Sequence, residues 1–198
     1  MTARRPSAAV RIAVLAPAAA IVLAGGAAGP AAAASPPDGP QRSYQISSTF
    51  SQGGAKAVTY DPARVPAGAG VTVSTRSTPG VTVTTLQVRG LLPNTVYGAH
   101  AHVKPCGATG DAAGPHFQYA QDPVTPSVDP AYANPRNEIW LDLTTDAEGN
   151  GRATSTNGWV FPADRRAHSV VLHDMATMTA PGTAGTAGAR AACVTVKF

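Results

Sequence analysis

Short segments in which hydrophobic and polar residues alternate run through the chain from residue 55 to its end. They cover residues 55–60, 71–76, 81–88, 96–103, 138–144, 152–156, 168–173 and 191–198. β-Branched residues are frequent in them, and turn sequences such as Pro79-Gly80 and residues 146–151 separate them. Alternation with a period of two is typical of strands, and no segment shows a helical period. We therefore predict an all-β sandwich or barrel.

Two long segments, residues 106–136 and 176–189, break this pattern of strands. Both are rich in glycine, proline and alanine and show no sustained period. Loops of this length in a compact domain are usually functional or disordered. We therefore look for the chemistry of the protein near these loops.

The first 34 residues have the composition of a secretory signal peptide. Three arginines precede residues 12–28, which are rich in Ala, Val, Ile and Leu, and small residues follow up to Ala34. The alternative is a retained membrane anchor, but Pro17 and Gly25 interrupt a run that is already short for a membrane span. We predict a signal peptide over residues 1–34, a flexible lead-in over 35–54 and a single β domain over 55–198.

Removal of the signal peptide lowers the positive charge of the chain. The full chain has 15 basic and 11 acidic residues, and three of the basic residues lie in the predicted signal. The mature chain then has a net charge of +1, with histidines neutral, and no cluster of Lys or Arg. This composition argues against a nucleic-acid-binding protein.

His100 and His102 are two residues apart in a predicted strand, so their side chains lie on the same face. Ala99, Ala101 and Val103 share the opposite face and can pack on a core. The pair is either half of a metal site or two exposed polar residues, and the motif alone does not decide between these interpretations.

The chain has two cysteines, Cys106 and Cys193. In an exported protein an even pair is most simply one disulfide, whereas a metal site is the minor alternative because no CxxC spacing is present.

Several motifs in the C-terminal half, taken in order, resemble the copper/zinc superoxide dismutases. They are residues 90–93 (GLLP), 98–102 (GAHAH), Cys106 with 114–117 (GPHF), 170–173 (VVLH) and 187–193 (AGARAAC). The resemblance covers residues 88–198 and implies an eight-stranded Greek-key β-barrel with long active-site loops.

The resemblance also implies roles for individual residues. The copper ligands would be His100, His102, His116 and His173, with His116 also taking part in catalysis. Arg190 would attract the anionic substrate, superoxide. Cys106 and Cys193 would form the disulfide of the family.

The chain departs from the family at the zinc site. The family supplies two further histidines and an aspartate there, but no histidine lies between His116 and His168. Asp142 could match the aspartate, and Glu138 falls near the position of one histidine. Because zinc prefers nitrogen and sulfur ligands, we expect zinc to be absent. The short, nearly uncharged loop before Arg190 also resembles the copper-only members of the family.

Without zinc, another group must orient His116. Glu138, Trp140 and Asp142 lie on one face of the predicted strand 138–144. We hypothesise that Glu138, or less favourably Asp142, holds His116 directly or through water. The alternative is that both are surface carboxylates.

We therefore predict a secreted or envelope-located copper-dependent superoxide dismutase without stable membrane insertion. The alternatives are a non-enzymatic copper-binding or copper-buffering protein and an interaction module with a decayed metal site. The sequence leaves the oligomeric state open.

Overall fold

The computed structural model describes residues 42–198, so the predicted signal peptide and the start of the predicted lead-in lie outside the described residues. No helix among the described residues is long and apolar enough to cross a membrane.

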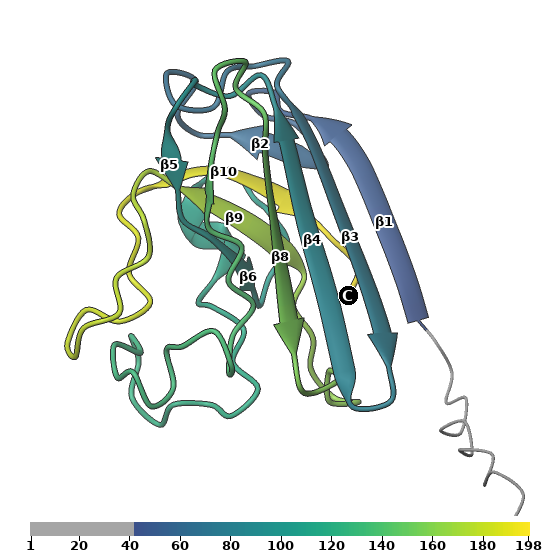
Figure 1. Ribbon diagram of the computed structural model, residues 1–198, viewed down its shortest axis with the longest axis vertical. Coiled ribbons are helices and arrows are strands. Elements are labelled where there is room, and N and C mark those ends of the chain that lie inside the picture. Colours follow the sequence, from purple (N-terminus) through teal and green to yellow (C-terminus); the bar gives the residue numbers. More distant parts are fainter. Residues whose placement is uncertain (1–41) are drawn as a thin grey trace, which may run out of the picture. The chain divides into compact units, whose positions relative to one another are not determined.

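Two four-stranded antiparallel sheets form the described domain, as the alternating pattern predicted (Figure 1). The first sheet has the order β1 (Arg42–Thr49), β3 (Gly70–Thr78), β4 (Val81–Arg89), β8 (Gly151–Asn157). The second has the order β2 (Ala57–Thr59), β10 (Arg190–Thr195), β9 (Ser169–His173), β6 (Ala99–His102). A short pair, β5 (Val96–Tyr97) and β7 (Leu143–Thr144), lies between β4 and β8 in the chain. The chain thus leaves the first sheet after β4 and returns to it at β8.

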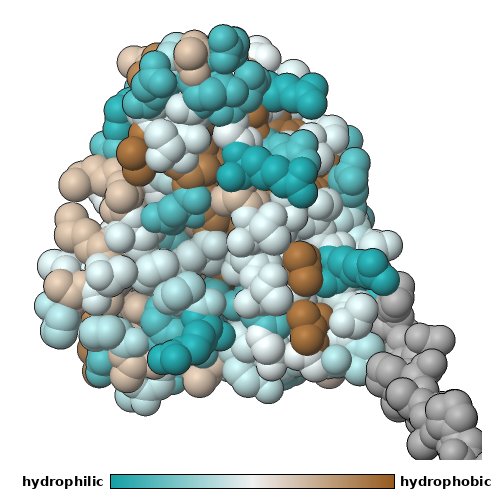
Figure 2. All heavy atoms as spheres, in the orientation of Figure 1, coloured by the Kyte–Doolittle hydropathy of each residue, from teal (hydrophilic) through white to brown (hydrophobic). Residues whose placement is uncertain are grey.

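The core lies between the two sheets. In β3 and β4 the cross-strand partners Val73 and Leu86 are both fully buried, as are Val170 and Leu172 of β9. The opposite face of the first sheet is polar. Figure 2 shows mostly hydrophilic or neutral residues over this side, with hydrophobic side chains only in small separate groups. One buried and one solvated face is the pattern that strict alternation requires.

From residue 42 onward, strand β1 corrects the prediction of a flexible lead-in over residues 35–54. Residues 42–49 pair with β3 along their whole length. The inward side chains of Tyr44 and Ile46 pack against the core, and Phe50, which follows the strand, is fully buried. Ser43, Gln45 and Ser47 belong to the solvent-facing half of this alternating strand.

Two further predicted strands are less regular than expected. The predicted strand 96–103 divides at Gly98 into β5 and β6. The predicted strand 138–144 is regular only at β7. Its earlier part still runs beside β6, where Ala101 N donates to Ile139 O and Leu141 N donates to Ala99 O. Ile139, Leu141 and Leu143 are buried, as the alternation predicted.

The two long loops leave the second sheet at the same side of the domain (Figure 1). Gly182 N of the second loop donates a hydrogen bond to Val128 O of the first, at 3.1 Å. The Cys106–Cys193 disulfide joins the start of the first loop to β10. The two loops are therefore joined to each other, and the first loop is also joined to β10.

Candidate metal centre

Strand β6 carries the first two histidines of the site. Its alanines Ala99 and Ala101 belong to the core, while His100 and His102 lie on the other face and are fully buried. The strand lies between β9 on one edge and residues 115–117 and 139–141 on the other. It is therefore enclosed on both edges, and the two imidazoles are held in fixed positions.

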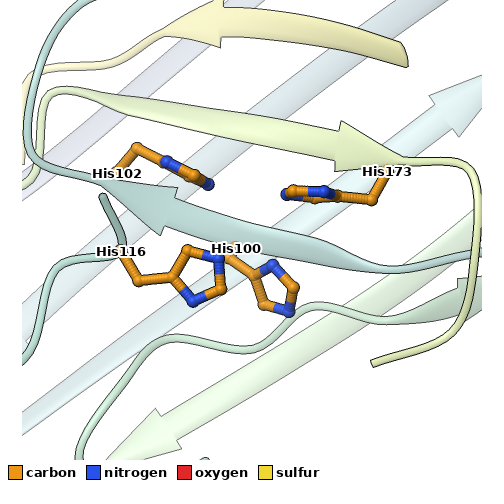
Figure 3. A group of neighbouring side chains, drawn as sticks. All are labelled: His100, His102, His116 and His173. Carbon is orange, nitrogen blue, oxygen red and sulfur yellow. The ribbon is translucent and has the colours of Figure 1, made fainter. Parts of the chain in front are cut away.

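The other two histidines are brought to β6 by its neighbours. His116 is bridged to His102 by antiparallel backbone pairing. His173 ends β9, where its backbone N donates to Gly98 O at 2.7 Å. One nitrogen from each of the four imidazoles lies within 4.8 Å of the others. Figure 3 shows the rings of all four converging on a common space.

Backbone carbonyls fix the ring orientation of two histidines. His102 Nδ1 lies 2.9 Å from Gly114 O, and His173 Nδ1 lies 3.4 Å from Gly188 O. A carbonyl oxygen only accepts, so each Nδ1 carries the proton. The Nε2 lone pairs of both rings are then free to bind a metal.

A threonine and an aspartate orient His100. The Thr177 hydroxyl lies 2.7 Å from Asp142 Oδ1 and 2.6 Å from His100 Nε2. The hydroxyl has one proton and gives it to the carboxylate, so it accepts from His100 Nε2–H. The free lone pair of His100 is therefore on Nδ1, unlike that of His102 and His173.

Glu138 contacts His116 directly. Its Oε2 lies 2.8 Å from His116 Nδ1, and its side chain is almost fully buried. Asp142 accepts hydrogen bonds from Thr177 instead. The alternative that Asp142 holds His116 is therefore wrong. The two carboxylates share one strand but orient different histidines.

The four inward nitrogens suit a metal ion. His100 Nδ1, His102 Nε2 and His173 Nε2 are buried and have no hydrogen-bond partner among the described residues. Buried polar atoms without partners are rare because each costs free energy, and a cation would supply the missing partner. Four imidazole nitrogens are a donor set that fits copper.

Burial keeps these histidines neutral, which is the state that binds a metal. It lowers the pKa of His100 and His102 well below the ordinary value, and the neighbouring His116 adds to this effect. Burial also lowers the pKa of His173, to about 4. The centre is therefore ready for a metal at neutral pH without releasing protons from these three rings.

Arg190 lies at the mouth of the centre. It is the cross-strand partner of His173 and lines a cleft of about 690 Å³ together with His116 and His173. One guanidinium nitrogen donates to Gly110 O at 2.8 Å, which anchors the side chain. Within residues 42–198 no other hydrogen bond uses its remaining N–H groups, so they are available to an anion. His168, the one histidine outside the group of four, is exposed and lines the same cleft.

Thr177 and the carbonyls of Gly114 and Gly188 are parts of the centre that the sequence pattern did not identify. Carbonyls leave no mark in a sequence, and Thr177 is one of several threonines in a loop without periodicity. Gln118, which also contacts Glu138, lacked a signal for the same reason.

No protein-family model matches the chain, and no curated protein matches its sequence. Solved structures do match. The Cu/Zn superoxide dismutase from Brucella abortus has a TM-score of 0.55 and 20% identity, with 79% of this chain and 100% of that chain covered. A double mutant of a superoxide-dismutase-like protein from Bacillus subtilis has a TM-score of 0.52 and 17% identity, with 72% and 95% covered. At these identities the likeness shows that the chain has the superoxide-dismutase-like fold.

Proposed function

We propose that the chain is an exported copper-dependent superoxide dismutase with one metal per site, like the copper-only members of that family. The observation that carries the proposal is the set of four converging imidazoles, each with its second nitrogen fixed, beside Arg190. The Cys106–Cys193 disulfide is consistent with export from the reducing cytosol.

Each group has a distinct task in this proposal. Copper bound at the four nitrogens would supply the Cu(II)/Cu(I) couple, which oxidises one superoxide to oxygen and reduces another to hydrogen peroxide. Arg190 attracts and orients the small anion in the cleft. Glu138 keeps the proton of His116 on Nδ1, so that Nε2 faces the metal position.

The contacts of Glu138 also support a site with a single metal. In a two-metal centre the second nitrogen of the bridging histidine binds zinc. Here that nitrogen, His116 Nδ1, already lies against a buried carboxylate. Zinc in an amount equal to copper in the purified protein would contradict the single-metal proposal.

The test is dismutation by copper-loaded protein, with Arg190→Ala as the variant. Loss of the guanidinium should lower kcat/KM for superoxide by about tenfold, because steering by charge raises encounter rates by this order or more. Copper content should be unchanged. The matched control is Arg152→Ala, which removes an exposed arginine from β8 and should leave turnover at the wild-type rate.

A non-enzymatic copper-binding or copper-buffering protein is the second candidate, favoured by the same four histidines. Stoichiometric copper without turnover would support it and contradict the dismutase proposal. Equal turnover in Arg190→Ala and Arg152→Ala would remove Arg190 from the mechanism.

A further inference from the structure

Glu138 is the acceptor at the centre of a buried hydrogen-bond network. Its side chain is almost fully buried, and three side chains contact its two oxygens. His116 Nδ1 and Trp140 Nε1 are both within hydrogen-bond distance of Oε2, at 2.8 and 2.7 Å. Gln118 Nε2 donates a hydrogen bond to Oε1 at 2.8 Å. A buried carboxylate with every oxygen paired has one defined orientation.

Trp140 and Gln118 donate to different oxygens of this carboxylate. Trp140 is two residues after Glu138 on the same segment, and its ring also packs edge-on to His100, with 5.7 Å between centroids. Gln118 follows His116 by two residues and is paired with Glu138 by a backbone bridge. The same amide also contacts Ser127 Oγ at 2.9 Å, in the long first loop. The carboxylate is thus held by two neutral donors that belong to different segments.

We propose that Trp140 and Gln118 are positioning residues for the metal ligand His116 and act on it through Glu138. This inference rests on the proposed function, because it assigns their role to a copper centre. Neither residue contacts the metal position. Their N–H groups aim Glu138 Oε2 at His116 Nδ1, and the rigid carboxylate takes the orienting task that a second metal ion has in a two-metal centre.

Trp140 offers the sharper test because the chain contains a second tryptophan, Trp159, that can serve as a matched control. Trp159 also donates one hydrogen bond, from Nε1 to Arg136 O at 2.8 Å, but it has no contact with Glu138. Trp140→Phe and Trp159→Phe therefore delete the same chemical group at two places. Only the first deletion should reach the metal centre.

The experiment compares Trp140→Phe, Trp159→Phe, Glu138→Gln and the double variant Trp140→Phe/Glu138→Gln. Copper affinity is measured by competition with a chelator, and the geometry of bound Cu(II) by the hyperfine coupling in its EPR spectrum. Trp140→Phe should weaken copper binding by about tenfold, as is common when an outer partner of a ligand is lost, and should change the coupling. Trp159→Phe should do neither.

The double variant tests whether Trp140 acts through Glu138. If it does, the double variant binds copper no more weakly than Glu138→Gln alone, because the two changes disrupt one path. Additive losses, or equal behaviour of the two Trp→Phe variants, would overturn the inference.

A measurement on metal-free protein separates this inference from the proposed function. ¹⁵N NMR of the imidazoles reports which nitrogen of His116 is protonated. Wild type and Trp159→Phe should show the Nδ1–H tautomer, and Trp140→Phe should show a mixture with Nε2–H. An unchanged tautomer in Trp140→Phe would overturn the inference even in a protein that turns over superoxide. If the tautomer changes in a protein that does not turn over superoxide, the positioning effect of Trp140 on His116 stands. Only the dismutase proposal is then rejected.

Discussion

Each histidine of the metal centre uses one ring nitrogen to bind a partner within the protein. Two partners are carbonyls, one is a carboxylate and one is the hydroxyl of Thr177. The partner decides which nitrogen is free, so the donor set is one Nδ1 and three Nε2 atoms. The protein thereby fixes the ligand atoms before any metal arrives.

The role of the Thr177 hydroxyl in orienting His100 can be tested by comparing Thr177→Val with Thr177→Ser. Valine keeps the shape of the side chain but leaves His100 Nε2–H, which is buried, without an acceptor. Such a loss costs about 1–3 kcal/mol, so copper affinity should fall by about tenfold or more. Serine keeps the hydroxyl and should bind copper as the wild type does. Chelator competition measures both, and equal affinities would mean that the hydroxyl does not orient His100.

Strand β1 is the element whose contribution is easiest to measure. Ile46 packs against the core from one face of β1, while Gln45 is exposed on the other. Ile46→Ala removes apolar contacts and should lower the free energy of unfolding by about 1–3 kcal/mol. Gln45→Ala should change it by less than about 0.5 kcal/mol. Urea unfolding measures both, and equal stabilities would show that β1 packs only loosely.

The elements that strict alternation defines were predictable from the sequence. The alternation in β6 predicted its inward face, with Ala99 and Ala101 below the two histidines, and Val71 and Val73 of β3 are likewise buried as an alternating strand requires. In β4 the alternation does not give the inward face, because Thr82 and Thr84 are buried while Val81 and Val83 are only half-buried. The pattern missed β1 because its polar half is made of serines and a glutamine, which also occur in linkers. The pattern also predicted a continuous strand over residues 138–144, of which only β7 is regular. The earlier residues form two single backbone hydrogen bonds with β6 and not a regular ladder.

The whole molecule should become less stable in acid when it contains no metal. Burial lowers the pKa of His173 to about 4, against about 6.5 in the unfolded chain. The folded state therefore binds fewer protons between these pH values, and stability present above pH 6.5 is lost as the pH falls toward 4. For His173 alone this amounts to about 3 kcal/mol, and His100 and His102 act in the same direction.

Urea unfolding of the metal-free protein at pH 7.5, 5.5 and 4.5 measures this loss. The control is His168→Gln, which changes an exposed histidine outside the cluster and should keep the full pH dependence. His173→Gln should lose part of it. A metal-free protein with the same stability at all three pH values would contradict the expected effect of burial.

The four clustered histidines could be found from the sequence because each lies in a short motif. Their partners could not, because the loops that carry Thr177 and Gln118 fold against β6 only in the finished domain. The hypothesis that Glu138 holds His116 depended on strand alternation. It agrees with the structure, in which Glu138 Oε2 lies 2.8 Å from His116 Nδ1.

The disulfide has a consequence for the order in which the molecule matures. Cys106 begins the loop that carries His116, and Cys193 lies three residues after Arg190 in β10. The covalent bond therefore joins the loop that carries His116 to the strand that carries Arg190. Oxidation of the two thiols should come before metal capture, so that a chain still in a reducing compartment has an incomplete metal centre. If the protein binds copper as proposed, its acquisition would be confined to a compartment in which the two thiols are oxidised.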